Sequence, residues 1–214
     1  YNMIISHKYK IVFIHIPKNA GTYIAAQLYK IDADVQNYII DGNGHMPYED
    51  IKKLKIYDEI KNYTFFAVVR NPINMYISFY HYAKKNKVHY FNSYVNNNDI
   101  LHTLKFCLDE KTHFKPNIYY ISESDEINNN IVLLNFENIS INFKKFITRI
   151  MLENNSDMNE QEINDVVQLI NDEKINDTLY YITDEKYIEI KKCLENDEYF
   201  SKDLIFFNNF KQNL

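Results

Sequence analysis

The sequence predicts an α/β fold in which helices flank a central, mainly parallel sheet. Short apolar runs rich in β-branched residues alternate along the chain with stretches of helical spacing. The runs are apolar at nearly every position, as expected of parallel strands buried on both faces. The 214 residues include only 3 glycines and 4 prolines, too few for the many tight turns of an all-β fold. The length suits one core, so we predict a single domain over residues 1–214.

The first strand and helix are expected near the N-terminus. The apolar run at 10–16 predicts a buried strand, which Pro17 ends. The stretch 23–30 has helical spacing, and Thr22 is a candidate N-cap. Residues 17–22 therefore connect a strand to a helix.

A second unit of the same kind follows. The run at 63–69 predicts another buried strand, and a helix is expected from Pro72 to about Lys85. Asn71 is the candidate N-cap, with Pro72 at the first helical position, where its missing N–H has no consequence. Arg70 then stands between strand and helix.

The remaining elements continue the alternation. We expect a short helix at 48–54, a helix at 99–109, a third core strand at 131–136, and amphipathic helices at 140–152, 159–171 and 184–195.

Composition excludes several classes of protein. Lys and Arg number 24 against 29 Asp and Glu, so the net charge of -5 lacks the basic field of nucleic-acid binders. Cys107 and Cys193 have no metal-ligand spacing, and we expect two buried free thiols and no metal site. No apolar run reaches the roughly 18 residues of a membrane span, and no secretory signal is evident. These features favour the cytoplasm, while an anchor upstream of Tyr1, in the Golgi or another membrane, stays compatible with them.

The segment Ile14-His-Ile-Pro-Lys-Asn-Ala-Gly-Thr22 has the features of an anion-binding loop. Helix N-termini present backbone N–H groups and positive potential, and Lys18 adds a full charge. Ala20 and Gly21 are small enough for an oxyanion to approach the backbone. Because Lys18 precedes Gly21, the loop is not a Walker A motif, which places lysine after its last glycine. A plain turn with a surface lysine is the alternative.

Arg70 and Ser78 form a second candidate phosphate site. Arg70 follows a core strand at the carboxyl edge, where open α/β sheets bind ligands, and its guanidinium suits a bidentate phosphate contact. Ser78, two turns into the next helix, can add a hydroxyl donor. Alternatively, the arginine pairs with a carboxylate and the serine bonds within its own helix.

His45 is the candidate catalytic base. The segment Gly42-Asn-Gly-His45 contains two of the three glycines of the chain. Histidine titrates near neutral pH, as a base that deprotonates a hydroxyl group must. A surface histidine in a loop is the alternative.

Together, Pro17-Lys-Asn-Ala-Gly-Thr22 and Arg70-Asn-Pro-x5-Ser78-x-Tyr80 resemble motifs of the sulfotransferases that use 3′-phosphoadenosine 5′-phosphosulfate (PAPS). The likeness is greatest to the carbohydrate-type branch, which includes heparan sulfate 2-O-sulfotransferases and bacterial and viral relatives. The resemblance implies a P-loop-like, three-layer fold and an enzyme that moves a sulfuryl group from PAPS to a hydroxyl acceptor, releasing the bisphosphate PAP without a metal. A carbohydrate is the expected acceptor.

The resemblance also implies roles for individual residues. Arg70 and Ser78 hold the 3′-phosphate, and His45 matches the Gly-His segment that supplies the base. Lys174 falls where relatives often place a loop that closes over the nucleotide, whereas Met75 replaces an arginine of many members. The residues implied in binding the 5′-phosphosulfate are Lys18, Asn19, Ala20, Gly21, Thr22 and Tyr23.

Two other functions are compatible with these motifs. A nucleotide or small-molecule kinase of the P-loop type lacks support, because neither Gly-Lys-[Ser/Thr] nor an evident magnesium-binding aspartate is present. A non-catalytic module that binds a sulfated or phosphorylated ligand is favoured by Met75 and disfavoured by the presence of Lys18 and His45 together.

Overall fold

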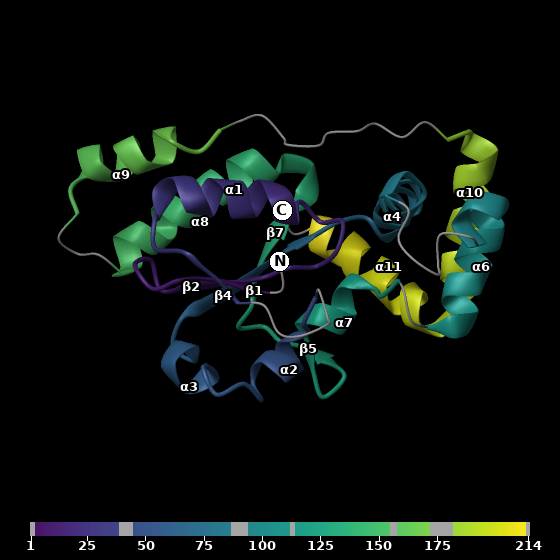
Figure 1. Cartoon of the computed structure of the whole chain (residues 1–214), viewed down its shortest axis with the longest axis horizontal. Coiled ribbons are helices and arrows are strands. Elements are labelled where there is room, and N and C mark those ends of the chain that lie inside the picture. The colour runs from purple at the N-terminus through teal and green to yellow at the C-terminus, as the bar shows by residue number, and fades with distance from the viewer. Residues whose placement is uncertain are drawn as a thin grey trace. The chain divides into compact units, whose positions relative to one another are not determined.

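A computed structural model describes residues 3–38, 45–86, 94–111, 114–154, 158–171 and 182–212 (Figure 1). The chain forms two compact units, and neither is continuous in sequence. The first consists of Tyr1–Val69 and Tyr120–Asp177, and the second of Arg70–Tyr119 and Thr178–Leu214. That residues 1–214 form a single domain stays a prediction.

A mixed sheet forms the centre of the first unit. In the described part of the chain its strands have the order β3-β1-β2-β4-β7. β2 pairs with β4 and β4 with β7 in parallel, whereas β1 is antiparallel to both β2 and β3. Four of the five strands thus run the same way, which confirms the mainly parallel sheet. The strands span Met3–Ser6 (β1), Ile11–Ile14 (β2), Gln36–Tyr38 (β3), Thr64–Val69 (β4) and Val132–Asn135 (β7).

One face of the sheet is covered by helices α1 (Gly21–Ile31), α8 (Ile139–Asn154) and α9 (Glu160–Gln168). Phe66 of β4 packs against Phe13 of β2 and Phe146 of α8, with ring centroids 5.1 and 4.6 Å apart. Strands β1, β2, β4 and β7 are apolar at most positions, as expected of strands covered by helices, whereas the edge strand β3 is polar and partly exposed.

The opposite face is covered by the short helices α2 (Tyr48–Ile51) and α3 (Tyr57–Ile60) (Figure 1). Phe65 points away from Phe66, since successive strand residues face opposite sides. Its ring packs against Tyr48 at 5.2 Å and Tyr57 at 6.3 Å. The first unit therefore has the three layers that the sequence predicts. Smaller elements in it are β5 (Ser122–Glu123), β6 (Glu126–Ile127) and the 3-10 turn η1 (Phe136–Asn138).

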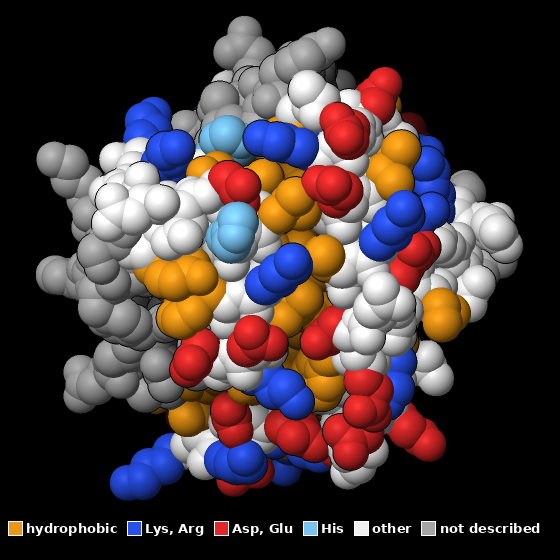
Figure 2. Space-filling model, turned by 90° about the vertical axis from the view of Figure 1, so that its right-hand side faces the viewer, with side chains coloured by type: hydrophobic (Ala, Val, Ile, Leu, Met, Phe, Trp, Pro, Cys, Tyr) orange, Lys and Arg blue, Asp and Glu red, His pale blue; other side chains and the backbone are white. Residues whose placement is uncertain are grey.

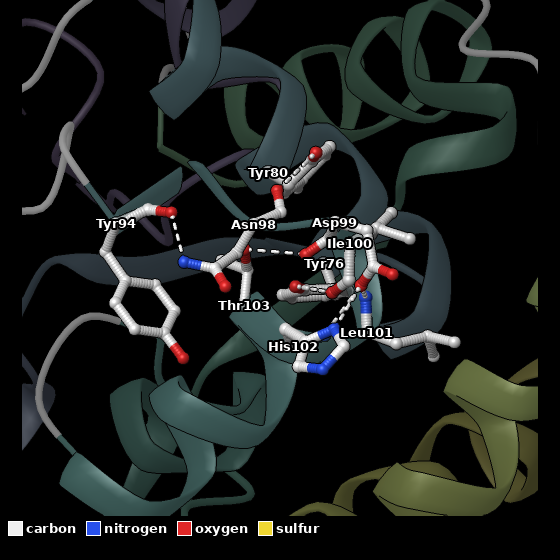
Figure 3. Close-up of polar contacts among 9 residues, drawn as sticks. All are labelled: Tyr76, Tyr80, Tyr94, Asn98, Asp99, Ile100, Leu101, His102 and Thr103. Carbon is white, nitrogen blue, oxygen red and sulfur yellow. Dashed lines mark hydrogen bonds and ion pairs between the residues drawn. The ribbon is translucent and has the colours of Figure 1, made fainter. Parts of the chain in front are cut away.

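The second unit is helical where it is described. Two of its helices begin at side-chain caps. Asn71, the predicted cap, accepts hydrogen bonds at Oδ1 from Ile73 N at 2.9 Å and Asn74 N at 3.4 Å. Asp99, which was expected inside a helix, is instead the cap of α6 and accepts from the amides of Leu101 and His102 (Figure 3). Its helices are α4 (Pro72–Asn86), α6 (Ile100–Glu110), α10 (Asp184–Asn196) and α11 (Glu198–Gln212), and the short α7 (Asn117–Ile121) leads back into the first unit.

Tyrosines of α4 donate hydrogen bonds to the first residue of α6 and to the segment before it. The hydroxyl of Tyr76 donates to Ile100 O at 2.6 Å, and that of Tyr80 to Asn98 O at 3.3 Å (Figure 3). Cys107 of α6 is buried as expected, and burial raises its thiol pKa to about 12, whereas Cys193 of α10 is only partly buried, contrary to the expectation.

On the side of the molecule that carries α6 and α10, acidic and basic side chains are interspersed (Figure 2). Hydrophobic side chains are exposed among them, and the exposed large ones of α10 and α11 are Ile188, Tyr199 and Ile205. Within the described ranges no helix combines the length and apolar character needed to cross a membrane.

Candidate functional site

The loop between β2 and α1 is held in place by Asn19. This side chain is fully buried, and its Nδ2 donates to Val68 O in the neighbouring strand β4 at 2.9 Å. On either side of it, Lys18 and Ala20 take left-handed backbone conformations, with φ of 65° and 60°. The side chain of Asn19 therefore has a structural role in fixing the turn.

Helix α1 begins with backbone amides that have no acceptor within the helix. Ala20 is the N-cap and has no side chain that can accept a hydrogen bond, and the first intrahelical bond runs from Ile24 N to Ala20 O at 3.0 Å. The amides of Gly21, Thr22 and Tyr23 precede that bond and have no acceptor within the helix. They can therefore bind an anion, assisted by the helix dipole.

The expected cap at Thr22 is wrong. The helix starts at Gly21, because the left-handed Ala20 turns the chain into it, and Thr22 is exposed in the first turn. Tyr23 is 1% exposed, and its hydroxyl donates to Asn171 O at 2.8 Å. The side chain of Tyr23 is therefore used in packing and in this hydrogen bond.

Gly21 is required by the close approach of His15. A Cβ atom at position 21 would lie 1.8 Å from Nε2 and 2.1 Å from Cδ2 of the His15 ring. His15 is 8% exposed and packs on Phe13 at 5.8 Å. His15, which directly follows β2, therefore packs against the start of the helix and has a structural role there.

His45 lies against the same loop. Its Nδ1 is 3.1 Å from His15 O, and the two rings meet edge to face at 4.5 Å. A carbonyl oxygen can only accept, so Nδ1 carries the proton and Nε2 of the neutral ring keeps its lone pair. Gly42 and Gly44, which the sequence analysis linked to His45, are outside the described residues.

The electrostatic environment keeps His45 neutral. Burial, the main cause, and the positive charge of Lys18 lower its pKa to about 4, although the hydrogen bond to His15 acts in the opposite direction. At neutral pH the ring is uncharged and can accept a proton at Nε2. Such a group can act as a general base.

Arg70 and Ser78 belong to the second unit. Arg70 directly follows the last residue of β4, is half-buried, and has a buried Nε atom. Ser78 is 8% exposed in α4, and Met75 is 1% exposed and contributes to packing. Lys174 is outside the described residues.

Asn117 and Asp203 are polar residues whose function the sequence analysis did not identify. Asn117 Oδ1 accepts from Arg70 N at 3.4 Å, and its Nδ2 donates to Arg70 O at 3.1 Å. Asp203, fully buried, accepts from Asn117 N at 2.9 Å, Asn117 Nδ2 at 2.8 Å and Ile118 N at 3.0 Å. A signal was present in the sequence, since Asp203 shares the apolar face of its helix with Phe200, Leu204 and Phe207.

No group of three or more His, Cys, Asp or Glu side chains in the described ranges could hold a metal ion. The residues that the first unit brings together are Lys18, the first amides of α1 and His45. Their charges and donors suit a ligand with anionic oxygens.

Comparison with known proteins gives one result. A family model described as "Sulfotransferase family" matches residues 1–182, and heparan sulfate 2-O-sulfotransferases belong to that family. The comparisons with curated proteins and with solved structures gave no match.

Proposed function

The chain belongs to the sulfotransferase family, a family of enzymes that transfer sulfuryl groups, and we propose that it uses PAPS as donor and a carbohydrate hydroxyl as acceptor. The observation that best supports a catalytic role is the position of His45 against the loop that carries Lys18. A neutral imidazole with one nitrogen fixed and the other available is what proton removal from a hydroxyl group requires.

In this proposal the first unit binds the 5′-phosphosulfate. Lys18 and the amides at the start of α1 neutralise and hydrogen-bond its oxygens, which suits the chemistry of the loop. Arg70 and Ser78 bind the 3′-phosphate, which distinguishes PAPS from ATP. A guanidinium forms two parallel hydrogen bonds to a phosphate, and this gives Arg70 the larger share of that selectivity.

The donor supplies an activated sulfuryl group, whose S–O bond to the 5′-phosphate breaks as the acceptor oxygen bonds to sulfur. Nε2 of His45 takes the proton of the acceptor hydroxyl and later releases it to solvent. Lys18 stabilises the negative charge that develops on the bridging oxygen of the leaving phosphate. These residues contribute position and charge, as in phosphoryl transfer, and the proposed reaction needs no metal.

The low pKa of His45 is compatible with this role. A pKa of about 4 keeps the free enzyme's imidazole unprotonated but makes it a weak base. Negative charge bound beside Lys18 would offset the effect of the lysine and raise the pKa. The base would then become stronger when the donor is bound.

Calorimetric titration of the wild-type protein with PAP, AMP and ADP, in the absence of metal, tests the donor assignment. We expect PAP to bind most tightly, and Arg70→Ala to remove that preference. Equal affinities for PAP and AMP in the wild type would contradict the assignment and favour the kinase.

A transfer assay tests turnover. PAPS is incubated with a panel of oligosaccharides, and release of PAP and sulfation of the sugar are measured together. His45→Ala should abolish both while PAP still binds. Tight binding of PAP without turnover on any hydroxyl acceptor would instead identify a binding module.

A further inference from the structure

A buried polar network surrounds the backbone of Arg70. Its centre is Asp203 of α11, a fully buried carboxylate that receives three hydrogen bonds from residues 117 and 118. Both carboxylate oxygens are used, Oδ2 by Asn117 and Oδ1 by the amide of Ile118. The start of α7 is thereby fixed on α11, although the two segments are 86 residues apart in sequence.

Asn117 passes this constraint on to Arg70. Its side-chain amide accepts from the N–H and donates to the C=O of Arg70, the pairing that a neighbouring strand would provide. The same Nδ2 also donates to Asp203, so the carboxylate fixes which way the amide points. The next residue, Asn71, caps α4 with its own side chain. The backbone is therefore held at Arg70 itself and one residue later.

Burying a carboxylate in this network costs free energy. Burial raises the pKa of Asp203 to about 6 even with three donors around it, because an ionised carboxylate is poorly solvated there. A neutral amide side chain in its place would avoid that penalty but would leave at least one of these donors without an acceptor. The carboxylate also fixes the orientation of Asn117. Nδ2 of Asn117 donates both to Arg70 O and to Asp203 Oδ2, so only one of the two orientations of the side-chain amide satisfies both acceptors.

We propose that Asn117 and Asp203 are positioning residues that fix the backbone of Arg70 so that its guanidinium is directed at the 3′-phosphate of the donor. This inference rests on the proposed function of Arg70.

The test measures nucleotide selectivity, the ratio of the dissociation constants for AMP and PAP, in Asn117→Ala and Asp203→Asn. The second change keeps the volume of the side chain but replaces one acceptor oxygen by an amide group, which faces donors and cannot bond to them. Thr103→Val is the matched control. Thr103 is also fully buried in the second unit, and its hydroxyl donates to Asp99 O at 2.9 Å (Figure 3).

We expect each network variant to lower the selectivity about tenfold, the size of one charge-assisted phosphate contact, with AMP affinity unchanged. Adding either network variant to Arg70→Ala should cause no further loss of selectivity, because the network acts through the contact that Arg70→Ala already removes. Thr103→Val should lower the melting temperature without changing the ratio. A network variant that melts earlier but keeps the wild-type ratio would overturn the proposal. A wild type with no preference for PAP would overturn the function of Arg70 itself, and the inference with it.

A measurement on the wild type covers the case in which these variants do not fold. If the network favours the conformation of Arg70 that binds the 3′-phosphate, binding must stabilise the network in return. Amide hydrogen exchange at Arg70, Asn117 and Ile118 should therefore slow more with saturating PAP than with saturating AMP. Equal protection by the two nucleotides would contradict the proposal.

Discussion

The contact between Gly21 and His15 makes Gly21→Ala the most informative single substitution. The added Cβ would lie 1.8 Å from His15 Nε2, whereas carbon and nitrogen atoms in van der Waals contact are about 3.5 Å apart. One of the two groups must then move by more than 1 Å. We expect overpacking to lower the free energy of unfolding by about 1–3 kcal/mol.

The same displacement should reduce turnover. His15 O accepts the hydrogen bond that orients His45, and the first amides of α1 follow directly after position 21. A misplacement of about 1 Å in a catalytic group can reduce turnover about 100-fold. Denaturant titration measures the loss of stability, and the rate of PAP release measures turnover. Thr22→Ala, in the same helical turn, adds no atom and should change the stability little.

A double substitution separates the clash from other effects of alanine. In a His15→Ala background the space is free, and alanine has a higher helix propensity than glycine by up to about 1 kcal/mol. The effect of Gly21→Ala on the free energy of unfolding should therefore change from destabilising to neutral or stabilising. An equal loss of stability in both backgrounds would show that the His15 ring is not the cause, and would refute the reasoning.

Three further predictions concern charged groups. Lys18→Ala should lower turnover at least 100-fold, because charge on the leaving oxygen is no longer neutralised, and should change the free energy of unfolding by less than about 1 kcal/mol. A loss of unfolding free energy as large as the increase in activation free energy would oppose a catalytic role for Lys18. The ring of His45, followed by NMR, should titrate near pH 4 in the free protein and at higher pH with PAP bound; a pKa that PAP leaves unchanged would argue against an anion beside Lys18. Burial raises the pKa of Asp203 in the folded protein to about 6, so between about pH 4 and 6 the folded protein binds more protons than the unfolded protein. The contribution of Asp203 to the free energy of unfolding should therefore fall by up to about 3 kcal/mol as pH rises through that window. Urea unfolding of wild type and Asp203→Asn at several pH values measures this contribution, and an identical pH dependence in the two proteins would contradict it.

Elements marked by local signals could be predicted from the sequence. Asn71 before Pro72 predicted the start of α4, and its side chain caps that helix. The cap of α1 could not be predicted in this way, because it depends on the left-handed backbone of Ala20 and has no capping side chain. Helix α11 was not predicted, although Asp197 accepts from the amides of Tyr199 and Phe200 at its start, an ordinary capping pattern.

Features that depend on distant pairs could not be predicted. The antiparallel strand β1 is only four residues long and is defined by its pairing with β2 and β3. His15 and His45 are 30 residues apart, and Asn117 and Asp203 are 86 apart. In the candidate site, the loop and the histidine were identified from residue types and spacing, whereas the orientation of His45 required the three-dimensional contacts.

The discontinuous first unit affects how the protein is made on the ribosome. Strand β4 ends at Val69, but its second neighbour β7 begins only at Val132, after the segment 70–119 has been synthesised. At a synthesis rate of roughly 5–20 residues per second, one edge of the apolar strand β4 stays unpaired for roughly 3–12 s before β7 is synthesised. Open strand edges are sites of intermolecular pairing, so nascent chains paused in this interval need protection from aggregation. A chain cut between the two strands would keep this edge permanently and should be recovered as insoluble material.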